Sequence, residues 1–190
     1  MSFEIGTDES LKITNKEISN LINAVYVKGG YMESLIAAFH HRPVNVRKRG
    51  YMLCARYKKT GVFAGMVILV NSNSPAAVFA NDDECEMHFL GVREEFRNKG
   101  LGRLLIKKII EKAKKAGFVK MILNTQTTMR TAQSLYESFG FLRNESRDFS
   151  YGKRKFIVYE KAITDTYCFT TEVRYSILSK AVFFCGSVFS

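Results

Sequence analysis

Apolar residues recur at helical spacing in several stretches of the chain. Near the N-terminus the stripe falls at i, i+3, i+4 and i+7, on Ile18, Leu21, Ile22 and Val25. Thr14 with Glu17 three residues later forms a capping box, which predicts where this helix begins. Gly29 and Gly30 predict where it ends. A second, short helix is expected over residues 32–39.

The most regular helical pattern lies over residues 105–115. One face is apolar and the other is mostly lysine, and the apolar positions are Leu105, Ile106, Ile109, Ile110 and Ala113. Gly117 predicts the end of this helix. A further helix is expected over residues 130–139, with Gly140 as its C-terminal cap.

Runs rich in aromatic and β-branched residues predict strands. Tyr51–Tyr57 and 62–70 are separated by Thr60 and Gly61, which is the pattern of a hairpin. Further strands are expected over 85–92 and 119–124, and a second hairpin pairs 141–149 with 154–159 around Gly152. Pro43 and Pro75 stand in polar stretches that indicate loops. Early hairpins followed by alternating helices and strands predict an α/β fold, α+β by some schemes, in which helices cover a mixed sheet.

Composition narrows the class of protein. The 190 residues are 46% hydrophobic and 25% charged, which suits one globular domain and excludes disordered and fibrous classes. The net charge of +11 favours anionic partners without selecting one. The apolar stretch 181–185 is too short to cross a membrane and no secretory signal is visible, so we expect a cytoplasmic protein without membrane contact. Cys54, Cys85, Cys168 and Cys185 form no CxxC pair, so we expect reduced thiols and no metal site.

The segment 97–102, Arg-Asn-Lys-Gly-Leu-Gly, lies between an expected strand and the most regular expected helix. Glycines there let backbone amides turn toward a ligand, and a helix start adds unpaired N–H groups and partial positive charge. With Arg97, Lys99 and Arg103 this indicates a pyrophosphate site. A Walker loop would need Ser or Thr where Leu104 stands, and a dinucleotide fingerprint would need glycine at Leu105. A solvated turn with basic side chains is the alternative.

Together with a second motif, this loop resembles the GNAT superfamily of acetyl-CoA-dependent N-acetyltransferases. That family carries an Arg/Gln-x-x-Gly-x-Gly/Ala loop, matched at 97–102, and then a Leu-Tyr and Gly-Phe signature, matched at Leu135, Tyr136, Gly140 and Phe141. The resemblance covers roughly residues 10 to 161. It implies a GNAT-like mixed, splayed sheet of six to seven strands with four helices, and coenzyme A between the parallel strands 85–92 and 119–124.

The same resemblance assigns the cofactor contacts. Backbone groups of the first parallel strand would bind the pantetheine and the thioester carbonyl, and the loop would bind the pyrophosphate. The residues are Phe89, Leu90, Gly91, Val92, Arg97, Asn98, Lys99, Gly100, Leu101, Gly102, Arg103 and Asn124. The chain departs from the family at Met129, where many members carry an asparagine that contacts the cofactor.

Two residues are predicted to be catalytic. An amine attacks a thioester only when neutral, so a base must accept a proton, and the departing thiolate gains from an acid. Glu86 stands eleven residues before Arg97, as the glutamate base of histone-acetyltransferase-like members does, while a solvated charge is the alternative. Glu84 and His88 share its strand face and are the reserve candidates. Tyr136 matches the acid of the family, and a purely packed core tyrosine is the alternative.

The charges are unevenly distributed. Residues 42–59 hold seven basic residues and no acid, whereas 82–95 hold six acids against Arg93 alone. The acidic stretch could attract an amine-bearing acceptor, and the basic stretch could face a polyanion such as RNA or simply be a solvated loop.

The sequence therefore predicts two regions and one function. Residues 1–161 form the acetyltransferase domain, and 162–190 form an apolar extension that packs on the domain or on a second subunit of a homodimer. We expect direct acetyl transfer from acetyl-CoA to a primary amine of a small molecule or protein in a ternary complex. The alternatives are a non-catalytic acyl-CoA-binding or regulatory module of the same fold, and a basic RNA-associated protein.

Overall fold

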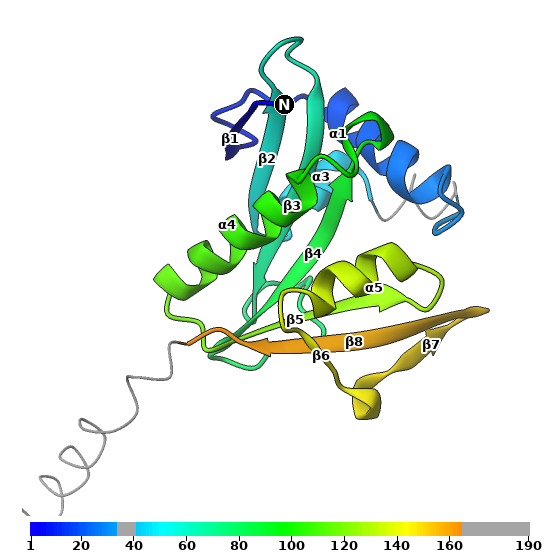
Figure 1. The fold of residues 1–190 in the computed structure, drawn as a ribbon. Helices are drawn as coiled ribbons and strands as arrows, with labels where there is room; N and C mark the ends of the chain where they lie inside the picture. The colour runs from blue at the N-terminus through cyan, green and yellow to red at the C-terminus, as the bar shows by residue number, and fades with distance from the viewer. Residues whose placement is uncertain (34–40, 165–190) are drawn as a thin grey trace, which may run out of the picture.

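The computed structural model describes residues 1–33 and 41–164. One sheet carries eight strands in the order β1-β2-β3-β4-β5-β8-β6, and β7 pairs with β8 (Figure 1). Neighbouring strands are antiparallel except β4 and β5, which are parallel. The elements in chain order are β1 (Phe3–Thr7), α1 (Asn15–Ile22), the π-helical turn η1 (Asn23–Val27), α3 (Pro43–Arg47), β2 (Tyr51–Tyr57), β3 (Phe63–Asn71), β4 (Glu84–Val92), the 3-10 turn η2 (Glu94–Phe96), α4 (Leu101–Lys115), β5 (Lys120–Gln126), α5 (Arg130–Glu137), β6 (Leu142–Arg143), the 3-10 turn η3 (Glu145–Arg147), β7 (Phe149–Tyr151) and β8 (Arg154–Ala162).

Helices cover both faces of the sheet and so create two hydrophobic cores. The apolar stripe of α4 packs on one face together with Tyr136 of α5. The apolar side chains of α1 and Val46 of α3 pack on the other face. The central strand β3 is buried at every position except its last residue, Asn71, because both faces of a central strand are covered. This arrangement confirms the mixed, helix-covered sheet that the sequence predicts.

The first helix begins as predicted. The Thr14 hydroxyl accepts from the backbone N–H of Glu17, and the Glu17 carboxylate accepts from the backbone N–H of Thr14. The prediction of a loop around Pro43 is wrong, because Pro43–Arg47 forms the short helix α3. Proline is favourable in a first helical turn, since its missing N–H would be unpaired there and its fixed φ suits a helix.

The later elements agree with the predictions apart from the last hairpin. Instead of one strand over 141–149, the chain forms the two short strands β6 and β7 separated by η3, and both pair with β8. The side chain of Asn144 accepts from the backbone N–H of Ser146 and so starts the intervening turn. The edge strand β1, which pairs with β2, was not predicted.

Several sequence predictions fall partly or wholly outside the described residues. These are most of the helix over 32–39, nearly all of the extension 162–190, and Cys168 and Cys185. Cys54 and Cys85 are buried free thiols, as predicted. Within 1–33 and 41–164, no helix is long and apolar enough to span a membrane. The same ranges contain no cluster of three or more His, Cys, Asp or Glu side chains that could hold a metal ion.

Candidate active site

The parallel strands β4 and β5 pair only at their beginnings. The paired positions run from Glu84 opposite Lys120 to Glu86 opposite Ile122, after which the strands separate (Figure 1). Both strands continue beyond that point, to Val92 and to Gln126. The edge of β4 that would otherwise bind β5 therefore has no strand partner along its second half. This is the splayed sheet that the sequence predicts.

A β-bulge sits where β4 leaves β5. Met66 of β3 is opposite Gly91 and Ile68 is opposite His88, so Val67 faces two residues of β4. One of these two, Phe89, has a φ of 51°, in the left-handed region that a bulky side chain seldom adopts. A bulge bends its strand and redirects the neighbouring side chains and backbone groups, and bulges are common beside active sites.

Side chains reach two backbone carbonyls on the open edge of β4. The Tyr26 hydroxyl donates to the carbonyl of Leu90 at 3.1 Å, and Arg97 Nε donates to the carbonyl of Val92 at 3.1 Å. The ring of Tyr26 also stands edge-on to Phe89, with centroids 5.6 Å apart. Tyr26 thus connects the turn η1 to the bulge. The sequence patterns did not single it out, because nothing in a helical stripe identifies the one aromatic residue that reaches another strand.

The loop after β4 has the backbone expected of an anion site. Gly100 has a φ of 79° and is the N-cap of α4, and no side chain caps this end of the helix. The backbone N–H groups of the first helical turn, from Leu101 to Arg103, precede the first i→i−4 partner and so have none within the helix. They point from the end of a 15-residue helix, where the helix dipole favours an anion.

The three cations predicted for this loop also make contacts within the protein. Besides the Arg97 contact, Lys99 Nζ donates to the carbonyl of Glu95 at 2.6 Å. Arg103 Nη1 donates to the Ser138 hydroxyl at 2.8 Å. Its guanidinium carbon also lies 5.0 Å from the centroid of Phe139. Arg103 therefore ties the start of α4 to the end of α5.

Asn124 and Tyr136 lie on the β5 side of the opening. Asn124 is partly buried in β5 and pairs with Val158 of β8. The Tyr136 ring packs in the core beside Phe141 and Tyr159, and burial raises the pKa of its phenol. Burial also raises the pKa of Tyr26, and the nearby Tyr136 adds to that rise.

Glu86 is buried and its carboxylate is saturated with hydrogen bonds. Oε1 accepts from the backbone N–H groups of Val78, Phe79 and Ala80, at 2.6, 2.6 and 2.9 Å. Oε2 lies 2.7 Å from Nε2 of His88. Burial alone would raise its pKa, but these donors outweigh burial and lower the pKa to about 2. Such a carboxylate stays ionised and is a weak proton acceptor, which weighs against the role of terminal base.

His88 connects Glu86 to Arg49. Its Nδ1 lies 3.3 Å from Nη1 of Arg49. A guanidinium can only donate and an ionised carboxylate can only accept, so Nε2 carries the proton and Nδ1 presents its lone pair. The guanidinium carbon of Arg49 also lies 5.0 Å from the centroid of the Phe89 ring. The chain of contacts therefore runs from the loop at Val78, through Glu86 and His88, to a cation at the bulge.

The contacts of the two charged stretches, 82–95 and 42–59, change the prediction made from their composition. In the acidic stretch, Glu84 is buried and pairs with Lys120 at 2.6 Å. In the basic stretch, Arg47 pairs with Asp8 and Arg56 pairs with Glu17, each at 2.7 Å. Much of each stretch therefore forms internal contacts rather than a surface of a single sign.

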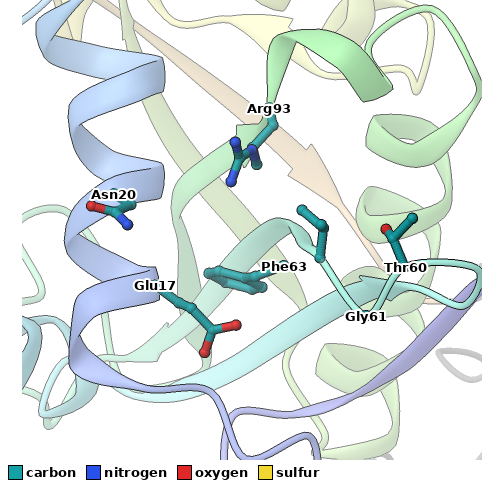
Figure 2. A pocket seen from close by; sticks show the side chains of 7 residues that line it. Glu17, Asn20, Thr60, Gly61, Phe63 and Arg93 are labelled. Atoms are coloured by element: carbon teal, nitrogen blue, oxygen red, sulfur yellow. The ribbon is translucent and has the colours of Figure 1, made fainter.

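A cavity of about 280 Å³ lies away from the Glu86 cluster. Figure 2 shows Glu17 and Asn20 of α1 on one side, the turn at Thr60 on the other, and Arg93 directed toward Phe63 between them. Both carboxylate oxygens of Glu17 bind Arg56, and Nε of Arg93 is 2.8 Å from Glu95. Its charged groups are thus already paired. A second hollow, of about 430 Å³, lies between α5 and β8.

Comparison with known proteins identifies similar chains and folds. Residues 16–141 match the family model described as the acetyltransferase (GNAT) family. The structure is similar to that of the PaiA N-acetyltransferase from Thermoplasma acidophilum, solved in complex with coenzyme A. The TM-score is 0.60 at 20% sequence identity, and the match covers 85% of this chain and 99% of the other. At this level of identity the likeness concerns the fold.

Two curated relatives match shorter stretches. An uncharacterized N-acetyltransferase of Schizosaccharomyces pombe is 40% identical over 96 residues, which are 50% of this chain and 54% of the relative. Another, from Dictyostelium discoideum, is 45% identical over 58 residues, which are 30% of this chain and 27% of the relative. The chain thus spans about half of one relative and about a quarter of the other.

Proposed function

The chain belongs to the GNAT family of acetyltransferases, and we propose that it transfers an acetyl group from acetyl-CoA to a primary amine by direct attack in a ternary complex. One observation carries the proposal: β4 and β5 part at Glu86, beside a bulge and before the uncapped N-terminus of α4. An elongated ligand with a phosphorylated end needs such an arrangement. The narrow, unphosphorylated part of such a ligand can bind along the open strand edge, and its phosphates can bind at the start of the helix.

The residues present fit acetyl-CoA. Gly100 has the left-handed backbone that turns the loop, and a Cβ there would meet nothing within 4 Å, so the space beside it is open. We propose that Phe89, Leu90, Gly91 and Val92 bind the pantetheine, with Asn124 across the opening. The loop residues would bind the pyrophosphate, namely Arg97, Asn98, Lys99, Gly100, Leu101, Gly102 and Arg103. Bound acetyl-CoA supplies an acetyl group activated as a thioester.

For proton removal, the contacts favour the pair of Glu86 and His88 over Glu86 alone. The carboxylate fixes the imidazole with its proton on Nε2, as a carboxylate does in many general-base pairs. Nδ1, whose lone pair accepts from Arg49 in this structure, accepts the proton of the attacking amine once Arg49 turns away from it. The charge that develops on the imidazole is stabilised by the ionised carboxylate. Tyr136 is proposed as the acid that protonates the departing thiolate.

The test is a screen of amines with acetyl-CoA in which release of free thiol is measured. The screen should contain free amino acids, polyamines and short peptides with free α-amines. Thiol release that depends on an added amine, together with a product heavier by one acetyl group, supports an acetyltransferase. A chain that binds acetyl-CoA, seen as a rise in melting temperature, but releases no thiol with any amine would instead be a binding module.

A matched pair of variants separates the proposed base from simple folding effects. His88→Gln keeps a polar side chain but removes the base, so turnover should fall by about 10² to 10⁴ while the response to acetyl-CoA is retained. Lys108→Gln on the exposed face of α4 is the control and should keep parental turnover. Parental turnover in His88→Gln would return the role of base to Glu86 or to a water molecule.

A further inference from the structure

Arg49 differs from every other partly buried arginine in residues 1–33 and 41–164. The others all lie within 4.0 Å of a carboxylate, and they are Arg47, Arg56, Arg93, Arg147 and Arg154. Arg49 has no carboxylate at that distance within those ranges. Its Nε is enclosed and makes no hydrogen bond. A charge removed from water without a counter-charge is costly, so its retention calls for a reason other than stability.

Glu86 is the acid whose charge acts on Arg49, but it makes no direct contact with the guanidinium. Glu86 adds an attractive charge, and burial lowers the pKa of Arg49 despite it. All the contacts of the Glu86 carboxylate are already made, with three backbone N–H groups and with His88. The imidazole stands between the two charges, since Nε2 contacts Glu86 and Nδ1 contacts Arg49. Among the described residues, the guanidinium therefore has one nitrogen beside His88 and no carboxylate in direct contact.

The Nη2 atom of Arg49 remains available to a ligand. It makes no hydrogen bond to a described residue, and it is not among the enclosed polar atoms without a partner, as Nε is. The guanidinium carbon lies 5.0 Å from the ring of Phe89, at the bulge beside the proposed thioester position. A planar guanidinium is the side chain that best recognises a carboxylate.

We propose that the acceptor is an α-amino acid whose carboxylate binds Arg49 while its amine lies beside Nδ1 of His88. The amine and the carboxylate of such a molecule are separated by one carbon, which suits a cation and a base whose nitrogens are 3.3 Å apart. The acceptor carboxylate provides the direct counter-charge that no residue within 1–33 and 41–164 supplies. The neutral amine attacks the thioester carbonyl, its nitrogen forms the new amide bond, its proton passes to Nδ1, and the sulfur leaves as thiolate.

This inference rests on the proposed function and excludes two other kinds of acceptor. A polyamine would place a second positive charge near Arg49, and like charges repel. The N-terminal amine of a protein has a neutral peptide carbonyl where an amino acid has its carboxylate, so it would leave the guanidinium unmatched. Transfer to a polyamine and transfer to a protein N-terminus are therefore outcomes that the test must distinguish.

The test compares each of the twenty L-amino acids with its carboxamide, using the full chain, saturating acetyl-CoA and thiol release. We expect at least one amino acid to exceed its amide in kcat/KM by about 10- to 100-fold, the effect of one charge-assisted contact. Arg49→Gln should remove most of that preference by lowering the value for the amino acid far more than the value for its amide. Lys48→Gln, on the exposed neighbour, should leave the preference unchanged.

Other outcomes would overturn the inference. They are amides acetylated as well as the amino acids, equal losses for both partners of a pair in Arg49→Gln, or transfer only to peptides or polyamines. In each case the proposed function stands, because acetyl transfer still occurs. Absence of thiol release with every amine overturns both. If Arg49→Gln fails to fold, the preference of the parental protein for an amino acid over its carboxamide still tests the inference.

Discussion

Replacing Glu86 by glutamine should destabilise the protein at neutral pH and remove the part of its acid sensitivity that Glu86 supplies. The pKa of Glu86 falls from 4.5 to about 2 on folding, which corresponds to about 3 kcal/mol of stability. Glutamine has nearly the same shape and can still accept the backbone N–H groups. Its amide, however, would donate toward His88, which forces the imidazole proton to Nδ1 and against the donor Arg49.

The sign of the pH dependence follows from the direction of the shift. A group whose pKa is lowered by folding stabilises the protein fully above its unfolded pKa, here 4.5. That contribution is lost as the pH falls from 4.5 toward 2. Glutamine does not titrate, so the free energies of unfolding of parent and variant should differ by about 3 kcal/mol near pH 7 and converge toward pH 2.

Urea unfolding at a series of pH values measures this difference. Glu111→Gln is the control, because Glu111 is exposed on α4, and its free energy of unfolding should stay within about 0.5 kcal/mol of the parental value. A gap between parent and Glu86→Gln that is constant from about pH 7 to pH 3 would refute the reasoning. It would mean that the carboxylate is not held ionised by the loop and His88.

Three further predictions concern the rest of the site. Gly100→Asp should abolish the stabilisation by acetyl-CoA in a thermal shift assay, whereas Gly117→Asp, whose φ of 86° imposes a similar backbone strain at the other end of α4, should keep it; equal loss in both would discredit the loop assignment. Tyr26→Phe should lower the free energy of unfolding by about 1 kcal/mol in urea, because the Leu90 carbonyl loses its donor, and an unchanged value would show that water replaces it. Tyr136→Phe should slow turnover by about 10²-fold at unchanged melting temperature, and parental turnover would exclude it as the acid.

The elements that local patterns specify were predictable, and those set by distant contacts were not. The capping box at Thr14 and the stripe of α4 fixed both helices, because capping and amphipathicity act within a few residues. The short helix α3 was missed. It is held by Arg47, which binds Asp8 and the carbonyl of Ile13, more than thirty residues away in sequence.

The candidate site likewise combines features that local patterns specify with features that distant contacts set. The loop at Gly100 has a local signature, so its place before α4 was predictable. For Glu86, the strand face and the spacing to Arg97 could be predicted from the sequence. The decisive contacts, however, come from the loop 78–80. No spacing rule predicts that a loop will fold back onto a carboxylate. Arg49 carried no signal at all within a run of basic residues. Only its contacts separate it from the five partly buried arginines that have carboxylate partners.

Direct acetyl transfer to an amine is the central claim, and one measurement tests it most directly. The protein is incubated with acetyl-CoA labelled in its acetyl group and with the mixed amines, and mass spectrometry then locates the label in the amines and in the intact protein. We predict label in an amide of one class of amine, with one coenzyme A released for each acetyl group transferred and none on the protein. Label on the Cys85 thiol, or coenzyme A released without any labelled amide, would contradict the account.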